Sequence, residues 1–346
     1  MKYCTNCLTA ETHEGISINK DGLCSVCQNI GYKDETDWQA KHEELIELKN
    51  SYKGKYQYDC IIPASFGKDS SFSLLYAIKD LGLKPLVVCC NHGFMRPNVM
   101  ENRKRAQEIL NFDILDFTIN RDIVKKLMLE SLRRTGDWCY PCHCLVYALP
   151  MHIAIRFKIP LLIWGESNRE YTSIFSEAEE VDEDRFKKVV NLGLDLKSMA
   201  EAMGIDIKDL WMMDYPDTED LKKINCRSIC LGNYIKWDTK ENVKRIKKEI
   251  GWQGDKVEGV PPEYDYEKIE CKFQGMRDYC IYLKKGFGRT AHLCAIDLRK
   301  GRTTKEKAKE LINKYDGKRP DSIEEFLDYI NIGEDDFYNI IDKIRG

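Results

Sequence analysis

The first residues whose spacing suggests chemistry are four cysteines near the start of the chain, Cys4-x-x-Cys7 and Cys24-x-x-Cys27. Two-residue spacing lets both thiolates of a pair reach one ion, and two such pairs complete a tetrahedral Zn²⁺ site. A redox pair or a coincidental pairing is the alternative. We favour structural zinc. Because a closed four-cysteine site leaves no open coordination position, we expect the ion to fold an N-terminal module.

A second group of thiols lies in the segment WCYPCHC at 138–144, which holds Cys139, Cys142, His143 and Cys144. The cysteines that could complete it lie far along the chain: Cys226, Cys230, Cys271, Cys280 and Cys294. Three interpretations stay open: a second zinc site, an iron–sulfur cluster with one open iron, and ordinary buried thiols. We slightly favour a metal site, with Cys139, Cys142 and Cys230 as its candidate ligands.

The segment IIPASFGKDSS at 61–71 runs from an apolar stretch through a turn into Lys68, Asp69 and two serines. In an open parallel sheet, ligands bind at the carboxyl ends of strands, and the positive end of the next helix favours phosphate. The segment is not a Walker loop, because Asp69 stands where that motif has Ser or Thr, and it lacks the three glycines of a dinucleotide fingerprint. The alternative is a plain strand-to-helix turn in which Asp69 or Ser70 caps the helix.

The same segment resembles the Ser-Gly-Gly-x-Asp-Ser loop of the PP-loop ATP pyrophosphatases, with Ser65, Gly67, Lys68, Asp69 and Ser70 in matching positions. The resemblance implies that ATP is cleaved between its α- and β-phosphates. It also implies that the loop holds the leaving pyrophosphate.

One residue of this loop departs from the pattern. Phe66 stands where the superfamily usually has its first glycine. A side chain bars backbone conformations that only glycine adopts readily. We therefore expect the amide of residue 66 to make poorer contact with the phosphates.

Basic residues gather around two glycine-bearing turns in KKGFGRTAHLCAIDLRKGRTTKEKA at 284–308. The candidates for ligand binding are Arg289, His292, Arg299 and Arg302. Arginine suits bidentate capture of a carboxylate or a phosphate, so we expect an anionic ligand. A solvated basic face beside a capped helix explains the local sequence equally well.

Together, these motifs make the chain resemble the N-acetyl sugar amidotransferases of the PP-loop superfamily, which act in bacterial surface-glycan pathways such as O-antigen and nonulosonic-acid biosynthesis. The resemblance covers nearly all 346 residues. Besides the paired cysteines and the loop, it rests on WGESNREY at 164–171, LGNYIKWD at 231–238 and GFGRTAHLCAIDLRKGRTTKEKA at 286–308. Ser167 departs from the family pattern, in which Asn directly follows the Gly-Glu pair.

The resemblance implies a reaction in which AMP is transferred from ATP to the oxygen of a sugar acetamido group, and ammonia then displaces AMP to leave an acetamidino group. ATP and Mg²⁺ are the implied cofactors beside Zn²⁺. The implied catalytic residues are Lys68, Asp69 and Glu166. The implied nucleotide-binding residues are Ser65, Phe66, Gly67, Lys68, Asp69, Ser70, Asn91 and Gly165. An acidic sugar or a nucleotide-sugar phosphate would bind Arg289, His292, Arg299 and Arg302.

Ammonia needs a source, since most of it is protonated and unreactive at neutral pH. The sequence contains no Gly-x-Cys-x-Gly elbow, and its second residue is Lys2 rather than a cysteine nucleophile. The resemblance therefore implies a separate glutaminase partner. We expect neither a membrane nor a nucleic-acid partner, and a homodimer is left open.

Two other classes of function compete with this one. A PP-loop tRNA thiolase can also combine a zinc module, the loop and an active-site C-x-x-C, in which case Cys139 and Cys142 would serve catalysis. A tRNA binder should carry a strongly basic surface, whereas the formal net charge here is -3. The other competitor is a non-enzymatic platform, in which Phe66 has disabled the loop and the zinc module binds a partner.

The elements that must position these residues alternate along the chain. Apolar strands are predicted at 58–65, 85–91, 112–119, 160–165 and 226–232, and amphipathic helices at 69–82, 98–110, 121–134 and 143–157. Such alternation is typical of a doubly wound parallel α/β sheet. We also expect a helix over 36–49 and two C-terminal helices, one capped by Thr303 with Glu306 and one that begins with its own cap at DSIEEFLDYI.

The sequence divides into four expected parts: a zinc module at 1–35, a linker helix at 36–56, a PP-loop ATP-binding domain at 57–240 and a helical, substrate-binding C-terminal region at 241–346. Hydrophobic residues make up 43% and charged residues 32% of the chain, which is ordinary for a globular protein. No apolar run approaches the roughly 20 residues of a membrane span. The N-terminus lacks the apolar core of a signal peptide, so we expect a cytoplasmic protein whose thiols stay reduced.

Overall fold

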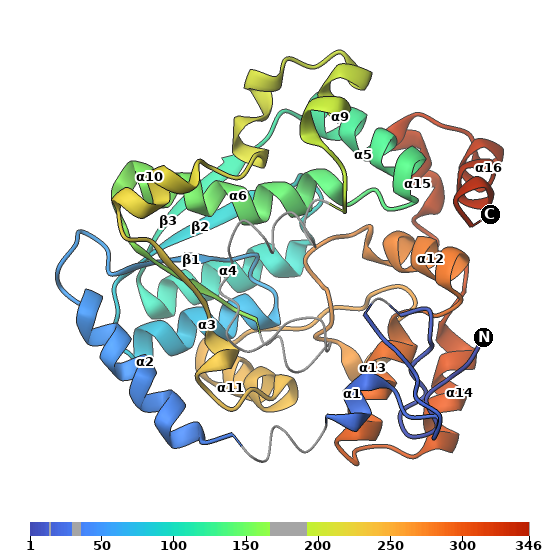
Figure 1. Cartoon of the computed structure of the whole chain (residues 1–346), viewed down its shortest axis with the longest axis horizontal. Coiled ribbons are helices and arrows are strands. Elements are labelled where there is room, and N and C mark those ends of the chain that lie inside the picture. The colour runs from blue at the N-terminus through green and yellow to red at the C-terminus, as the bar shows by residue number, and fades with distance from the viewer. Residues whose placement is uncertain (14, 30–35, 167–191, 346) are drawn as a thin grey trace.

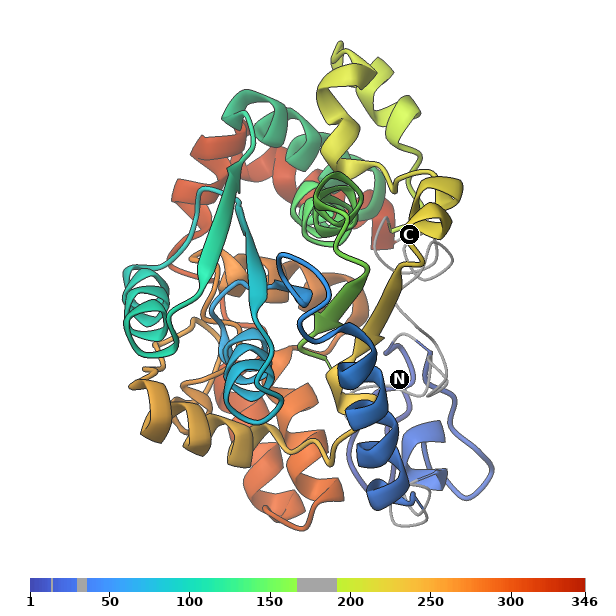
Figure 2. The same ribbon diagram turned by 90° about the vertical axis from the view of Figure 1, so that its left-hand side faces the viewer.

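Five parallel strands form one sheet with the first strand in its middle. The computed structural model describes residues 1–13, 15–29, 36–166 and 192–345. The strands are β1 Cys60–Pro63, β2 Pro85–Asn91, β3 Asp113–Thr118, β4 Leu161–Trp164 and β5 Arg227–Cys230. They lie side by side in the order β3-β2-β1-β4-β5 (Figure 2). The chain thus winds from β1 to one edge and then to the other, and open sheets of this kind bind ligands where the winding reverses, at the carboxyl ends of the strands.

Alternate residues of each strand face two different apolar cores. In β1, Cys60 and Ile62 belong to one core and Ile61 to the other, as the two-residue period of a strand requires. The helices that cover the first face are α3 Lys68–Lys79, α4 Pro97–Leu110 and α11 Thr239–Ile250. The second face is covered by α5 Arg121–Thr135 and α6 Tyr140–Phe157, above the sheet in Figure 1. Helices on both faces make the sheet doubly wound.

The remaining helices surround this central unit. They are α1 Ser25–Gln28, α2 Trp38–Tyr52, α9 Leu196–Met203, α10 Thr218–Lys223, α12 Gln274–Lys285, α13 Arg289–Arg299, α14 Lys305–Tyr315, α15 Ile323–Ile330 and α16 Glu334–Arg345. Short 3-10 helices span Ile207–Met213, Leu231–Asn233 and Pro262–Tyr264. Of the helices that the structure describes, none has the combination of length and apolarity that crossing a membrane requires.

The helices α12, α15 and α16 share their core with the sheet, whereas α13 and α14 form a small cluster of their own around Cys294, Ala308 and Leu311. Phe273, Phe326 and Phe337 are fully buried in the same cluster as residues of α5 and α6. The N-terminal cysteine module packs on α13 through Ala295 and Leu298. Figure 1 shows this module beside α13 and α14. The C-terminal region is therefore in a position to contribute side chains to sites on the sheet.

The predicted fold class and the order of its strands and helices are confirmed, with element ends shifted by a few residues. Two predicted caps are corrected. The cap of α14 is Thr304 instead of Thr303, and its hydroxyl accepts a hydrogen bond from the amide of Lys307. Ser322 precedes α15 but makes no side-chain cap, because its hydroxyl donates to the carboxylate of Glu258.

Candidate active site and metal centre

The predicted phosphate loop follows β1 and ends at Gly67, the N-cap of α3. A Cβ atom added to Gly67 would lie 1.8 Å from Oε1 of Glu270, so the carboxyl group of Glu270 packs directly against this glycine. The loop is tied locally: the hydroxyl oxygens of Ser65 and Ser70 lie 3.4 Å apart, and the amide of Gly67 donates to the Ser65 hydroxyl at 3.5 Å. The loop thus lies at the carboxyl end of the central strand, where a helix begins.

Phe66 adopts the backbone conformation that its side chain was expected to prevent. Its φ is 60°, in the left-handed region that favours glycine, so the side chain does not bar this conformation, and poorer contact of the amide with the phosphates stays a prediction. Its ring is fully buried and stacks on Phe112 with centroids 6.3 Å apart, and its carbonyl accepts a hydrogen bond from Trp252 at 3.0 Å. Such backbone strain costs about 1–3 kcal/mol, which burial of the ring, worth about 1.5–3 kcal/mol, can offset.

Lys68 and Asp69, the first two residues of α3, carry the charges that follow the loop. The Lys68 side chain is only 3% exposed, and its Nζ lies 2.7 Å from Oδ2 of Asp69 and 3.0 Å from Oε2 of Glu267. The contact with Glu267 is an ion pair whose geometry is not that of a directed hydrogen bond. The second oxygen of Asp69, Oδ1, is buried and has no hydrogen-bond partner among the described residues. Burial raises the pKa of the Asp69 carboxyl to about 6, although Lys68 opposes the shift.

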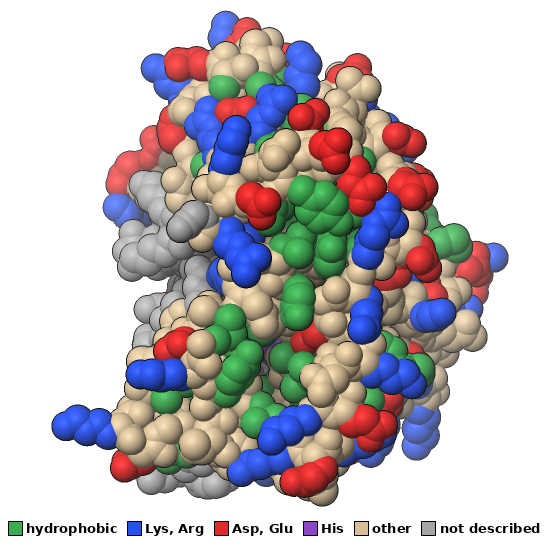
Figure 3. Space-filling view, turned by 90° about the vertical axis from the view of Figure 1, so that its right-hand side faces the viewer, with side chains coloured by type: hydrophobic (Ala, Val, Ile, Leu, Met, Phe, Trp, Pro, Cys, Tyr) green, Lys and Arg blue, Asp and Glu red, His purple; other side chains and the backbone are tan. Residues whose placement is uncertain are grey.

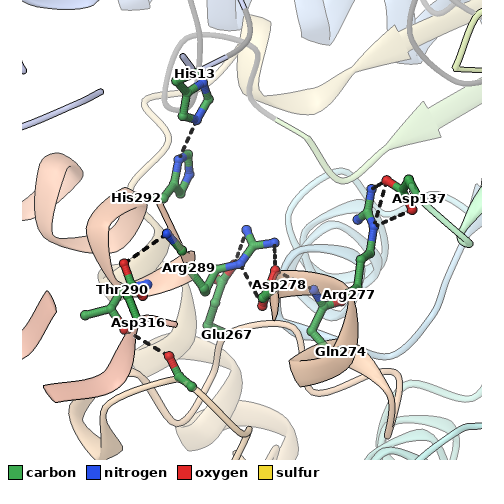
Figure 4. A network of polar contacts seen from close by, with 12 residues as sticks. His13, Asp137, Glu267, Gln274, Arg277, Asp278, Arg289, Thr290, His292 and Asp316 are labelled. Carbon is green, nitrogen blue, oxygen red and sulfur yellow. Dashed lines mark hydrogen bonds and ion pairs between the residues drawn. The ribbon is translucent and has the colours of Figure 1, made fainter. Parts of the chain in front are cut away.

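Glu267 connects the loop to the C-terminal basic motif, and sequence reasoning missed it. Its side chain is 1% exposed, and its other oxygen, Oε1, lies 3.5 Å from Nη1 of Arg289. Arg289 also pairs with Asp278 at 2.9 Å, and Gln274 donates to that carboxylate at 3.0 Å (Figure 4). Burial alone would raise the pKa of Glu267, but Lys68, Arg289 and Lys268 lower it to about 2. Glu267 is therefore ionised throughout the physiological range, and no motif in the sequence marks it.

Asn91, Gly165 and Glu166 lie where the sequence placed them, at the ends of β2 and β4. Asn91 accepts a hydrogen bond from the amide of Gly93 at 2.9 Å, which closes a tight turn. A Cβ on Gly165 would lie 2.7 Å from the carbonyl oxygen of Asp69, so this glycine lets β4 approach the start of α3. Glu166 accepts a hydrogen bond from the hydroxyl of Tyr147. Ser167 and the rest of the WGESNREY segment lie outside the described residues.

The four basic residues of the C-terminal motif do not converge on one point. Arg289 takes part in the network at Lys68, whereas Arg302, beyond the other end of α13, pairs with Asp238. The guanidinium of Arg299 donates to Sγ of Cys7 at 3.5 Å. His292 contacts a residue of the cysteine module: its Nδ1 lies 3.3 Å from Nε2 of His13 (Figure 4). The predicted substrate-binding residues are thus divided among three places.

The N-terminus of α13 is not open to a phosphate. Its first amides, those of Gly288, Thr290 and Ala291, donate to the carboxylate of Asp316 at 3.0, 2.9 and 3.0 Å. A carboxylate there satisfies the helix dipole as a bound anion would. An anion bound near this motif must therefore be held by side chains.

The four N-terminal cysteines form a preassembled metal-ligand set. Their sulfur atoms all lie within 4.8 Å of one another, and all four residues are buried. Sγ of Cys4 is 3.8 Å from that of Cys27, and Sγ of Cys7 is 3.6 Å from that of Cys24. Hydrogen bonds from Cys24 and Cys27 lower the pKa of the Cys7 thiol well below its usual range. Four converging sulfurs, one of them favoured as a thiolate, fit a tetrahedral soft-metal site.

The second group of cysteines does not assemble in the same way. Within the described part of the chain, the N-terminal set is the only group of three or more Cys, His, Asp or Glu with ligand atoms this close together. Cys230 is fully buried in the core, and burial raises the pKa of the thiols of Cys139 and Cys142. The geometry therefore supports ordinary thiols, buried at Cys230 and partly buried at Cys139 and Cys142, and does not support a metal site formed by these three residues.

Comparisons with known proteins bear on the C-terminal region most directly. Residues 263–346 match the model of the C-terminal domain of LPS biosynthesis protein WbpG-like proteins. An uncharacterized protein of Methanocaldococcus jannaschii is 25% identical over 164 residues, which cover 47% of this chain and 58% of that relative's length. A solved structure, a predicted subunit of tRNA methyltransferase from the same organism, aligns over 56% of this chain and 87% of its own with 18% identity and a TM-score of 0.26.

The matched region begins just before the residues that reach the phosphate loop. Glu267, Asp278 and Arg289 all belong to it, and so does His292. Residues 263–346 of this chain are thus similar to the C-terminal domain of WbpG-like proteins, and one glutamate of this WbpG-like domain contacts the lysine of the loop after β1.

Proposed function

We propose that this protein is an ATP-dependent amidotransferase that converts the acetamido group of a sugar into an acetamidino group in the biosynthesis of lipopolysaccharide or a related surface glycan. The observation that carries the proposal is the contact of Lys68 with Glu267, which joins a PP-loop-like segment to a WbpG-like domain. The PP-loop-like segment suits ATP binding, and the similarity of residues 263–346 to WbpG-like proteins supports a role in LPS biosynthesis. An enzyme that activates a glycan precursor with ATP needs both parts in one site.

The reaction must overcome the poor reactivity of an amide. Transfer of AMP from ATP to the acetamido oxygen forms an O–P bond, releases pyrophosphate and makes that oxygen part of a good leaving group. Ammonia then attacks the amide carbon, and AMP departs with the original oxygen. The products are an acetamidino sugar, AMP and pyrophosphate. We expect most of the rate enhancement to come from positioning of the reactants and from stabilisation of the charge that develops during the reaction.

The loop residues have the properties that the first step needs. The amino group of Lys68 is held by two carboxylates and would exchange Glu267 for the phosphates of ATP. The amides at the start of α3 and the hydroxyls of Ser65 and Ser70 would face the same phosphates. For ATP to bind there, the carboxyl group of Glu270 must leave Gly67, and charge repulsion by the phosphates would favour that movement.

One carboxylate oxygen at the start of α3 is suited to bind Mg²⁺. Oδ1 of Asp69 is buried without a hydrogen-bond partner among the described residues, and a carboxylate oxygen is the ligand that Mg²⁺ prefers. When bound, the ion would neutralise charge on the phosphates. The proposal keeps Zn²⁺ in the separate four-cysteine site, where all four ligands come from the protein and the role is structural.

Mass spectrometry tests the proposal. Candidate acetamido sugars are incubated with the protein, ATP, Mg²⁺ and an ammonium salt, and the products are examined for replacement of oxygen by NH. ATP–pyrophosphate exchange that depends on the sugar identifies the adenylation step. Sulfur transfer to tRNA without any action on acetamido sugars would instead establish the thiolase, and the absence of nucleotide binding would overturn both enzymes.

A further inference from the structure

A turn of the WbpG-like domain lies directly on the start of α3. At one end of this turn, Oε2 of Glu267 lies 3.0 Å from Nζ of Lys68, and at the other end the carboxyl group of Glu270 packs against Gly67. These two contacts hold the turn on the loop after β1, and consecutive Cα atoms lie only about 3.8 Å apart. Lys268, between the two glutamates, is therefore close to the place where ATP is proposed to bind.

The backbone of Lys268 is in the left-handed conformation, with a φ of 50°. Asn111, Lys158 and Asn331 have the same conformation, but they are helix C-caps, where it is usual. Lys268 ends no helix. A left-handed backbone is unfavourable for a residue with a side chain, and such strain gathers at functional sites. The conformation therefore points to a functional reason for a lysine at this position.

The amino group of Lys268 has no hydrogen-bond or ion-pair partner among the described residues, although the side chain is partly buried. The neighbouring cations, Lys68 and Arg289, each contact two carboxylates of the protein. A phosphate that approaches either of them competes with those carboxylates. Lys268 can bind a phosphate without breaking an ion pair of the protein.

The positive charge of Lys268 acts on the groups at the start of α3. Burial raises the pKa of Asp69, and Lys268 joins Lys68 in opposing that rise. Lys268 is also among the cations that lower the pKa of Glu267. The chain has a formal net charge of -3, and acidic and basic side chains are mixed over the face drawn in Figure 3. Attraction of a polyanion therefore depends on individual cations at the site.

We propose that Lys268 is a further catalytic residue, which binds the phosphates of ATP that leave as pyrophosphate. The inference rests on the proposed function and adds to it a cation from the WbpG-like domain. In the first step the acetamido oxygen bonds to the α-phosphorus, and the bond from that phosphorus to the bridging oxygen breaks, with its electron pair leaving on pyrophosphate. Lys268 stabilises the negative charge that grows on this leaving group.

Isothermal titration calorimetry of the full, zinc-loaded protein with ATP, inorganic pyrophosphate and AMP tests this assignment. Lys268→Met keeps an unbranched side chain but removes its charge. It should weaken the binding of ATP and of pyrophosphate roughly tenfold or more and leave AMP affinity nearly unchanged. Sugar-dependent ATP–pyrophosphate exchange should also slow at saturating ATP. The matched control is Lys256→Met, which alters an exposed lysine nearby in the sequence and should behave as the wild type.

Lys268→Gly separates this role from a structural one. Glycine adopts the left-handed conformation without strain, so the variant should unfold at the same urea concentration as the wild type or at a higher one. Its pyrophosphate affinity should nevertheless fall as in Lys268→Met. Lower stability with unchanged affinity would make Lys268 a structural residue and overturn the inference.

Failure of the inference is distinguishable from failure of the proposed function. Equal affinities of the wild type and Lys268→Met for ATP and pyrophosphate would overturn the role of Lys268. So would absence of pyrophosphate binding by the wild type, or an equal loss of AMP and pyrophosphate affinity in Lys268→Met. Absence of exchange with every acetamido sugar would count against the amidotransferase, whereas the ATP and pyrophosphate titrations alone judge Lys268.

Discussion

A carboxylate oxygen of Glu267 lies 3.0 Å from the amino group of Lys68, although the two residues belong to opposite halves of the chain. The glutamate is buried in the WbpG-like domain, and the lysine opens the helix that follows the central strand. Through Arg289, the same glutamate reaches the C-terminal basic motif. One buried side chain therefore couples the loop expected to bind ATP to the domain expected to bind the sugar.

Replacing Glu267 with Gln should weaken both stability and the first chemical step. The substitution keeps the shape but leaves Lys68 and Arg289 with less negative charge around them, and breaking a buried pair costs about 3 kcal/mol. Misplacement of Lys68 should slow sugar-dependent ATP–pyrophosphate exchange by about 10- to 100-fold. Urea unfolding and exchange assays measure the two effects.

Glu263 provides the matched control for this substitution. It lies four residues earlier in the same segment but is exposed. Glu263→Gln should change neither unfolding nor exchange, since exposed charges contribute little. If Glu267→Gln retained full exchange activity, Glu267 would be a purely structural residue.

The acid limb of the stability profile should depend on Glu267. Its pKa is lowered from the ordinary value of 4.5 to about 2, so the unfolded chain binds a proton more readily than the folded one. The stabilisation is therefore fully present above pH 4.5 and is lost as the pH falls from 4.5 towards 2. The difference in unfolding free energy between wild type and Glu267→Gln should shrink between about pH 5 and about pH 3. A difference that stays constant across this range would contradict the assigned shift.

Substitutions of Phe66 should separate backbone strain from burial of the ring. Loss of the ring costs about 3–5 kcal/mol, but glycine relieves the strain of the left-handed backbone and recovers about 1–3 kcal/mol. Phe66→Gly should therefore be destabilised by about 2 kcal/mol, with ATP affinity and products unchanged, because residue 66 already has a glycine-like conformation. Calorimetric unfolding and ATP titration measure these effects.

The control for Phe66→Gly is Phe66→Ala. Alanine also removes the ring but keeps the left-handed penalty, so it should be less stable than the glycine variant by about 1 kcal/mol. Equal stability of the two variants would show that the backbone of residue 66 is not strained. Altered products in Phe66→Gly would make the ring part of the active site.

The fold could be predicted from the sequence because its inner strands β1, β2 and β4 are largely buried on both faces, whereas β3 at the edge is partly exposed. Short runs such as PLVVCCN at 85–91 are almost entirely apolar, and the helices between them carry one apolar face. A continuous apolar strand is therefore easily distinguished from the 3.6-residue period of a helix. Helix N-caps were harder to predict, since a single hydrogen bond decides whether Thr303 or Thr304 caps α14. The competing bond from Ser322 to Glu258 comes from a residue far away in the sequence.

The site was predictable only where its residues are neighbours in the chain. The loop and the four cysteines have diagnostic local spacing, whereas Glu267, Glu270 and His13 become recognisable only through their contacts. In the basic motif, by contrast, neighbours in the sequence do not form one site. Arg289 and Arg299 stand at the two ends of α13, so residues that look clustered in the sequence face different parts of the molecule.

The source of nitrogen makes a further prediction. Purified protein alone should use ammonium salts but not glutamine, because the sequence holds no Gly-x-Cys-x-Gly glutaminase elbow. Product formation with each nitrogen donor, followed by mass spectrometry, measures this preference. Efficient turnover of glutamine without an added partner would refute a separate glutaminase.

Removal of the metal should unfold the cysteine module and change ATP binding little. The four thiolates are the ligands of the expected zinc, and a closed site of this kind loses its fold without the ion. Cys24→Ser should therefore lower the zinc content from about one ion per chain and expose the N-terminal module to proteolysis.

ATP binding provides the internal control for this last prediction. The groups around Lys68 come from α3 and the WbpG-like domain, so ATP affinity should change little in Cys24→Ser. Cys226→Ser, which alters a cysteine outside the four-sulfur set, should retain zinc and bind ATP normally. A Cys24→Ser protein that keeps its zinc and resists proteolysis as the wild type does would show that the four cysteines do not hold a structural ion.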